Sequence, residues 1–256
     1  MKAIDTHCHL NHTLKRGLKL NIILQNAQKN NVVALIDSPV YITDYLQSIR
    51  FHKKYSDKIF VTLGAPPANY HEINIESVIV SIREHAEKKE IVGIGEVGLD
   101  YYWVKKQAIR TKQHEIFKRF IKLANELNLP LTVHSRDAEK DSVDILSIAE
   151  TPVIMHSFSG DVETALESVD RGYYISIPTA VTNRKKYRRL AEAIPLENLI
   201  TETDSPYLSP FPDKKRNEPA NVIYAVKEIA KIKELTENEV ANVTTDNAIK
   251  IFNLKI

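Results

Sequence analysis

Hydrophobic positions along the chain fall into eight short runs, each separated from the next by a segment long enough for a helix. Short apolar runs bounded by polar or turn-forming residues are typical of buried strands. The predicted strands cover residues 3–7, 32–36, 59–63, 91–94, 131–134, 152–156, 173–176 and 199–202.

The segments between these runs have the spacing of amphipathic helices. In the clearest one, the apolar residues that share a helical face are Ile116, Phe117, Phe120, Ile121, Ala124 and Leu127. Thr236 and Glu239 have the spacing of a capping box and predict the start of a last helix. This alternation predicts a (β/α)8 TIM barrel that forms one domain over 1–256, although an open doubly wound sheet fits the same pattern.

The composition adds limits rather than a function. Of 256 residues, 43% are hydrophobic and 27% charged, and the net charge of +2 gives no strong field toward nucleic acid. One cysteine excludes an internal disulfide, no apolar run approaches the ~18 residues of a membrane span, and the first residues lack a signal-peptide core. We therefore expect a cytoplasmic protein without a membrane partner, either a monomer or an oligomer of unknown size.

The segment GIGEVG at 93–98 matches the G-x-G-x-x-G fingerprint of dinucleotide-binding loops. Such a loop must open a helix, whereas an aromatic turn follows here and the next helix is predicted to begin only near Gln107. A carboxylate at Glu96 would also repel the phosphates. We therefore expect the glycines to permit close packing around Glu96.

Metal-binding residue types gather where the predicted strands end. His7 and His9 are two apart in an extended chain and so point to the same side, with Cys8 directed into the wall. Other strands end with Glu96, His134, His156 and Asp204. In a parallel barrel these ends converge on one mouth, and six such ligands exceed the needs of one tetrahedral ion. Two divalent ions bridged by a carboxylate fit better.

Five motifs occur in order at these strand ends: DTHCHL at 5–10, GEVGLDYY at 95–102, HSRDA at 134–138, HSFSG at 156–160 and ETDSP at 202–206. This set resembles the TatD family of metal-dependent deoxyribonucleases, and the similarity runs from residue 3 to about 219, where RNEP at 216–219 also matches. The resemblance implies a TIM barrel that hydrolyses DNA phosphodiesters, as a 3′–5′ exonuclease on single strands.

The same resemblance assigns the ligands. One ion would be held by His7, His9, Glu96 and Asp204. The second would be held by Glu96, His134 and His156, so that Glu96 bridges the two. Asp204 would also orient the attacking water, supported by Glu202 one layer deeper, unless Glu202 is a buried charge paired with Arg or Lys. Imidazoles favour zinc, manganese or cobalt, whereas the family is described as magnesium-dependent.

Substrate contacts are open to two interpretations each. Arg136 suits a phosphate or an ion pair with Asp137, and Arg216 precedes a predicted helix start at Pro219 where it could meet an anion. Tyr101 and its two aromatic neighbours are placed to stack a base or to cap the barrel mouth. The basic run at 184–189 fits a nucleic-acid groove as well as a solvated helix face.

Two positions depart from the family pattern. Pro66 stands where the third strand usually ends in a histidine, and Asn11 stands where aspartate is usual. The missing imidazole bears on rate or end specificity rather than on the metals. Three functions therefore remain: a DNA phosphodiesterase, an ester or amide hydrolase of the same superfamily such as a D-aminoacyl-tRNA deacylase, and a barrel that binds without turnover.

Overall fold

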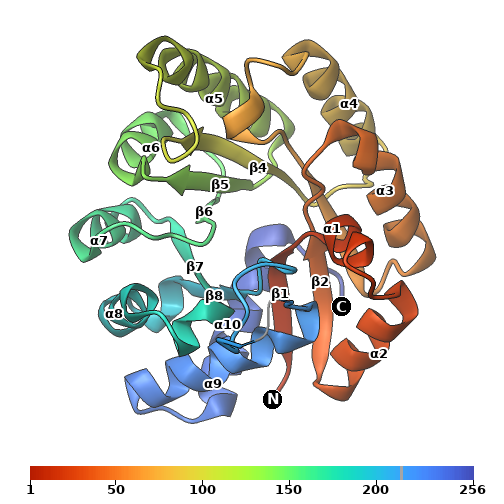
Figure 1. The fold of residues 1–256 in the computed structure, drawn as a ribbon, viewed down its shortest axis with the longest axis vertical. Helices are drawn as coiled ribbons and strands as arrows, with labels where there is room; N and C mark the ends of the chain where they lie inside the picture. The colour runs from red at the N-terminus through yellow and green to blue at the C-terminus, as the bar shows by residue number, and fades with distance from the viewer. Residues whose placement is uncertain (214–215) are drawn as a thin grey trace.

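A ring of eight parallel strands surrounded by helices forms the centre of the protein in a computed structural model that describes residues 1–213 and 216–256 (Figure 1). The strands are β1 (Ala3–Cys8), β2 (Val32–Asp37), β3 (Ile59–Leu63), β4 (Gly93–Asp100), β5 (Leu131–Arg136), β6 (Val153–Met155), β7 (Tyr174–Pro178) and β8 (Leu199–Glu202). Neighbours in the sheet follow the order of the sequence. The ring closes where Cys8 bridges Ser205 and the Asp204 N–H donates to the His7 carbonyl at 2.9 Å. The predicted barrel is confirmed, and the open doubly wound alternative is wrong.

Helices cover the outside of the strands. They are α1 (Leu10–Lys15), α2 (Leu20–Lys29), α3 (Tyr45–Lys54), α4 (Ile75–Glu87), α5 (Gln107–Leu127), α6 (Glu139–Ile145), α7 (Val162–Asp170), α8 (Lys185–Ala193), α9 (Val222–Lys233) and α10 (Glu237–Phe252). The predicted helix start near Gln107 is confirmed. So is the capping box at Thr236 and Glu239, whose side chains bond each other's backbone N–H.

Several strands end later than the apolar runs predicted, and β4 does so by the most residues. β4 continues to Asp100 and β5 to Arg136, because the two strands stay paired as far as these residues. Glu96 therefore lies within β4 rather than at its end. The hydrophobic run under-predicted β4 because Gly95, Glu96 and Gly98 interrupt it, although Val97 and Leu99 beyond them are buried.

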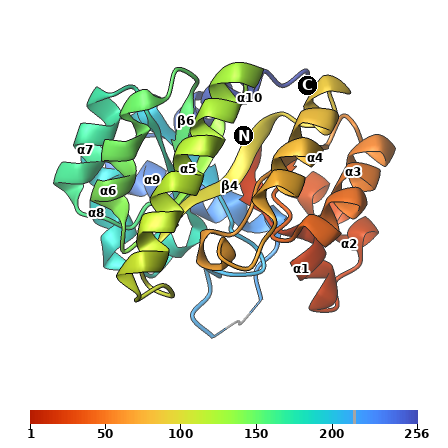
Figure 2. The same cartoon turned by 90° about the horizontal axis from the view of Figure 1, so that it is seen from above.

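Helix α10 closes one end of the barrel, as Figure 2 shows, with α1 and the loop after β8 at the opposite end. Its Ala248, Ile251 and Phe252 belong to one buried cluster with Ile4, Ala34, Ile36, Phe60, Ile154 and Ile200 of the strands. The apolar end of the barrel is thereby sealed, and the other end is left for polar side chains.

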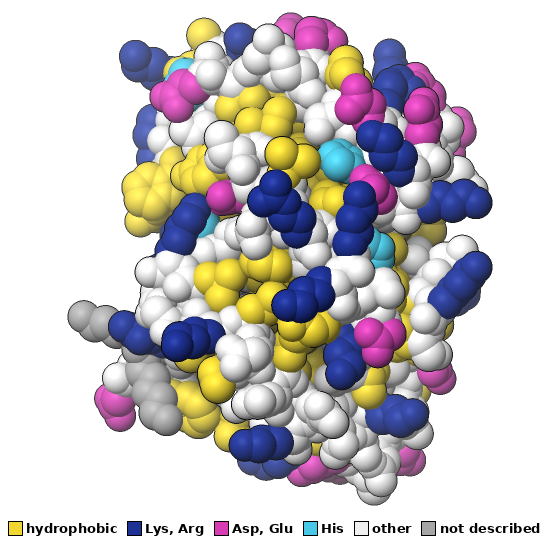
Figure 3. Space-filling view, turned by 90° about the vertical axis from the view of Figure 1, so that its right-hand side faces the viewer, with side chains coloured by type: hydrophobic (Ala, Val, Ile, Leu, Met, Phe, Trp, Pro, Cys, Tyr) yellow, Lys and Arg dark blue, Asp and Glu magenta, His cyan; other side chains and the backbone are white. Residues whose placement is uncertain are grey.

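Two observations describe the outer surface of the described residues. Within the part of the chain that the structure describes, no helix is both long and apolar enough to cross a bilayer. Lys and Arg side chains are dispersed over the face that carries α1 to α4 (Figure 3), in keeping with the small net charge.

Candidate metal centre

Six side chains from five strands meet at the open end of the barrel. Glu96 lies at their centre: its Oε2 is 3.5 Å from His7 Nε2 and 3.9 Å from His9 Nε2. Its Oε1 is 2.5 Å from His134 Nδ1 and 3.9 Å from His156 Nε2. The sixth member, Asp204, places Oδ1 at 3.2 Å from His9 Nε2. The structure thus brings together all six residues that the strand ends indicated.

Backbone and hydroxyl oxygens anchor the two histidines of β1. His9 Nδ1 lies 2.6 Å from the Ser38 carbonyl oxygen, and His7 Nδ1 lies 3.3 Å from Ser38 Oγ. The other nitrogen of each ring faces Glu96. His7 Nε2 is buried and has no hydrogen-bond partner among the described residues. A buried ring nitrogen without a hydrogen-bond partner fits the role of a metal ligand.

Carboxylates anchor the other two histidines. His134 Nε2 lies 3.0 Å from Asp100 Oδ2, and His156 Nδ1 lies 2.9 Å from Glu202 Oε2. Glu202 is fully buried, and its partner is this imidazole rather than an Arg or Lys. A carboxylate on the far nitrogen of an imidazole is the usual support of a metal-bound histidine, because it fixes the tautomer and the ring orientation.

The donor atoms form two overlapping groups of metal-binding geometry. In each group, the ligand atoms all lie within 4.8 Å of one another. The groups are His7, His9 and Asp204, and His7, Glu96 and His156. Nitrogen and carboxylate oxygen donors of this kind fit zinc, manganese and related divalent ions.

Two glycines allow Glu96 to reach the centre. A Cβ on Gly95 would lie 2.5 Å from Cβ of Thr132, and one on Gly64 would lie 2.5 Å from the Glu96 carbonyl oxygen. Both distances are far shorter than van der Waals contact, so only glycine fits. The resemblance of GIGEVG to a dinucleotide loop is therefore coincidental, since Gly93, Gly95 and Gly98 lie within strand β4 rather than in a loop that opens a helix.

The imidazoles and carboxylates at the centre shift one another's pKa values. Burial, assisted by the neighbouring His156, lowers the pKa of His7 to about 3. Burial acts in the same direction on His9 and His134, but bonded carboxylates outweigh it: Asp204 raises the pKa of His9 to about 9, and Glu96 raises that of His134 to about 10. The pKa of Glu96 is held well below its usual value, against burial, chiefly by His134. Protons thus occupy places that a cation would take, and binding an ion must displace them.

A buried carboxylate at the start of the first motif holds Asp204 in place. Asp5 accepts hydrogen bonds from the Thr203 N–H at 2.8 Å and from its Oγ1 at 2.6 Å. Asp204 itself has a positive φ of 54°. Asn217 of the RNEP motif, also buried, donates to the Thr203 carbonyl at 3.0 Å. Sequence analysis gave no role to Asp5 or Asn217, although both lie inside the quoted motifs.

A cleft of about 550 Å3 opens over the metal-binding side chains. Its walls include Trp103, Arg136, Arg184 and Lys186. Burial and the charges of Arg184 and Arg136 lower the pKa of Lys186, so these three cations are close neighbours. Arg188 of the same basic run is turned outward and paired with Glu228. The run 184–189 therefore divides between the cleft and an outer helix face.

Arg136 packs on an aromatic ring at the edge of the cleft. Among the described residues it forms no ion pair with Asp137, and its guanidinium carbon lies 3.6 Å from the centroid of the Tyr102 ring. It remains exposed along the cleft, where an anion has access to it.

Two of the expected substrate contacts lie away from the cleft walls. The Tyr101 hydroxyl donates to Asp141 at 2.6 Å, and the ring is stacked beneath Arg110 at 4.2 Å. Arg216 is exposed beside Gly17, where its Nη1 would lie 3.7 Å from an added Cβ. The structure brings Trp103, not Tyr101, to the cleft. Chain spacing could not separate adjacent aromatics of one turn.

The two departures from the family pattern occupy different surroundings. Pro66 lines the cleft, so the position of the missing imidazole does face the site. Asn11 is buried and donates to Ser48 Oγ at 3.0 Å, which an aspartate could not do. His12 also lines the cleft, with Nδ1 3.1 Å from the Tyr207 hydroxyl. Sequence reasoning missed His12, although it lies three residues after His9.

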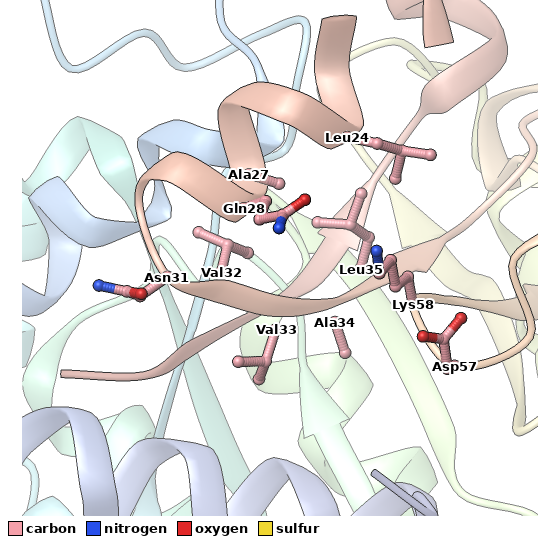
Figure 4. A pocket seen from close by; sticks show the side chains of 10 residues that line it. All are labelled: Leu24, Ala27, Gln28, Asn31, Val32, Val33, Ala34, Leu35, Asp57 and Lys58. Carbon is pink, nitrogen blue, oxygen red and sulfur yellow. The ribbon is translucent and has the colours of Figure 1, made fainter. Parts of the chain in front are cut away.

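A second cavity of about 260 Å3 lies between α2 and β2 (Figure 4). Its walls are Leu24, Ala27, Gln28, Asn31, Val32, Val33, Ala34, Leu35, Asp57 and Lys58. None of the six clustered side chains reaches it, so the chemistry belongs to the cleft.

An eight-stranded parallel barrel with imidazoles and carboxylates at its open end defines the class of metal-dependent hydrolases. The model of a family described as TatD related DNase matches residues 4–253. The chain belongs to this family, and it is a hydrolase.

Relatives and solved structures agree with this assignment. The chain is 38% identical to an uncharacterized metal-dependent hydrolase of Methanocaldococcus jannaschii, over 100% of this chain and 99% of that one. It is 32% identical to a human deoxyribonuclease, over 97% and 94% of the two chains. A crystal structure of a TatD family hydrolase from Entamoeba histolytica shares the fold, with a TM-score of 0.86 at 21% identity over 98% of each chain.

Proposed function

We propose that the six clustered side chains hold two divalent ions with Glu96 as the bridge. The observation that carries the proposal is the arrangement of the four imidazoles: each has one ring nitrogen bonded to a protein oxygen and the other directed toward Glu96. The two oxygens of Glu96 also face different pairs, Oε2 toward His7 and His9, and Oε1 toward His134 and His156. His7, His9 and Asp204 would complete one site, and His134 and His156 the other.

Bound ions would supply positive charge for phosphate oxygens and lower the pKa of water. The residues of the chain do the rest. Asp204 orients the attacking water as a hydrogen-bond acceptor, and Glu202 holds His156 so that Nε2 faces the centre. Arg136, Arg184 and Lys186 bind phosphates on either side of the scissile bond.

We infer that the substrate is DNA, attacked from the 3′ end of a single strand. The human relative's name, deoxyribonuclease, supports DNA. Three cations along one wall of the cleft support a polyanion rather than a small neutral ester. Arg216 would meet a phosphate further along the strand, and Tyr101 would act by supporting its loop.

The test is incubation of purified protein with single-stranded DNA labelled at the 5′ or the 3′ end, with Mg²⁺, Mn²⁺ or Zn²⁺. Shortening from the 3′ end, abolished in Glu96→Gln and retained in Glu90→Gln, is the expected result. Glu90 is a matched control, because it bonds a histidine, His85, outside the cleft. DNA left intact with all ions, together with hydrolysis of an ester or aminoacyl substrate, would replace this function by the second hydrolase hypothesis.

Two further expectations remain predictions. We expect one catalytic domain over 1–256 and a cytoplasmic location, in line with the single, buried Cys8. The oligomeric state is open, and light scattering of the purified protein would determine it.

A further inference from the structure

The exposed Trp103 is the unusual feature of the cleft. It is the only tryptophan in the sequence, and 67% of its surface is accessible. It lines the cleft together with Glu96 and His134. Exposed aromatic rings on soluble proteins mark sites that contact a partner or ligand.

The segment that carries Trp103, between β4 and α5, is tied down at several points. Lys105 Nζ donates to the Tyr101 carbonyl at 2.9 Å, and Arg110 Nε donates to the Val104 carbonyl at 2.9 Å. Val104 is buried. The indole is therefore presented by a fixed backbone, and little ordering is required when a ligand stacks on it.

One carboxylate links the segment that carries Trp103, called the aromatic platform below, to the metal centre. Asp100 Oδ1 accepts a hydrogen bond from the backbone N–H of Trp103 at 2.7 Å, and its Oδ2 lies 3.0 Å from His134 Nε2. The imidazole that faces Glu96 and the backbone that carries the indole thus share one support. A group stacked on the indole would lie close to the metal-binding side chains, because both line the same cleft.

A cation and a second ring complete the platform. Tyr102 meets Trp103 edge to face, with centroids 4.9 Å apart at 88°. The Arg136 guanidinium carbon lies 3.6 Å from the Tyr102 centroid and 5.9 Å from that of Trp103. An open indole face beside a guanidinium matches a nucleotide, which carries a flat base next to a phosphate.

We propose that Trp103 stacks the nucleobase adjacent to the scissile phosphate, while Arg136 binds the neighbouring phosphate. This inference rests on the proposed nucleic-acid substrate, and it names the contact that sets the position of the strand on the metal centre. Tyr101 hydrogen-bonds Asp141 and packs beneath Arg110, and these contacts hold the segment that carries Trp103.

The single tryptophan makes the contact directly measurable. We would record its fluorescence in protein loaded with Ca²⁺ in place of the ions used for cleavage. Two separate titrations would be compared, one with a short oligodeoxyadenylate and one with an abasic phosphodiester of the same length and charge. Quenching by the base-containing strand and not by the abasic one is expected. Equal quenching by both would overturn the stacking contact.

Variants separate the base from the phosphates. Trp103→Ala has no tryptophan, so its binding is measured by the anisotropy of a fluorescently labelled strand. It should weaken binding of the base-containing strand roughly 5- to 150-fold, the range for loss of one base–aromatic stack, and leave abasic binding unchanged. Trp103→Phe should restore most of the loss. Val80→Ala, which shortens an exposed apolar side chain on α4, is the matched control. Equal affinity of Trp103→Ala and the native protein for both strands would refute the proposal.

A strand with one abasic residue, moved stepwise from the 3′ end, locates the stacked base. Its effect should be confined to the nucleotide next to the cleaved bond and vanish in Trp103→Ala. Base-dependent quenching without cleavage by any ion would keep the stacking and overturn the hydrolysis of DNA. Cleavage without base-dependent quenching would overturn the stacking and keep the hydrolysis.

Discussion

Replacement of Glu202 by glutamine tests how a buried carboxylate acts through a histidine. Glu202→Gln preserves the shape of a fully buried side chain and a possible acceptor for His156 Nδ1, but it removes the charge. If His156 holds an ion through Nε2, the weaker support should reduce metal affinity. Loss of such a support lowers metal affinity ~10- to 100-fold.

The expected loss of metal-induced stabilisation follows from the linkage between metal binding and folding. At an ion concentration of ~100 times the native Kd, binding at one site stabilises the fold by ~2.7 kcal/mol. A 10- to 100-fold rise in Kd reduces this to ~1.4 or ~0.4 kcal/mol by the same relation. At roughly 2–4 °C per kcal/mol for a chain of this size, the metal-induced rise in Tm should shrink by roughly 3–9 °C.

The metal-free protein should respond differently. Burial raises the pKa of Glu202, despite the opposing effect of His156. A carboxyl whose pKa is raised on folding binds its proton more tightly in the native state. Its contribution to stability is therefore present below the pKa of the unfolded state and is lost as the pH rises through the raised pKa of the native state. At neutral pH the uncharged Glu202→Gln variant should therefore be at least as stable as the native protein without metal.

Differential scanning calorimetry of both proteins, with chelator and with added ion, measures the two effects together. Glu90→Gln serves as the control, because it removes a carboxylate bonded to His85 at 2.6 Å outside the centre. An unchanged metal-induced Tm rise in Glu202→Gln would refute the reasoning. Loss of stability in the metal-free variant alone would show that the carboxylate supports the barrel rather than the ion.

Two further predictions concern the bridge and the cations. Glu96→Gln should lower activity and reduce ion occupancy at both positions by elemental analysis or anomalous scattering; loss of one ion only would make Glu96 a terminal ligand. Binding of single-stranded DNA should fall with salt with a log–log slope of about −0.7 per phosphate contact, and two or three contacts are expected. Arg184→Ala should reduce the slope by about one contact, and Arg216→Ala should do so only if the strand extends past the cleft. A slope near zero would contradict a polyanionic substrate.

The substrate contacts show where reasoning from sequence reached its limit. The residue types of 101–103 predicted an aromatic turn, and the structure turns Tyr101 toward Asp141 and Trp103 toward the cleft. Side chains in a turn have no fixed periodicity, so neighbours cannot be assigned to one side or the other. The directions of the strand-end histidines could be predicted, because side chains alternate between the two faces along a strand.

The sequence by itself determined the alternation of strands and helices and the residue types of the centre, whereas closure of the strands into a ring was decided by the tertiary structure. Strand and helix periodicities are local, and polar residues that end several parallel strands must converge at one mouth. Only the tertiary structure decided which nitrogen of each histidine faces Glu96, that Asp5 clasps Thr203 across 198 residues, and that Phe252 of α10 seals the opposite end. These features depend on contacts between residues far apart in the chain, whose partners are set by packing and not by any local pattern.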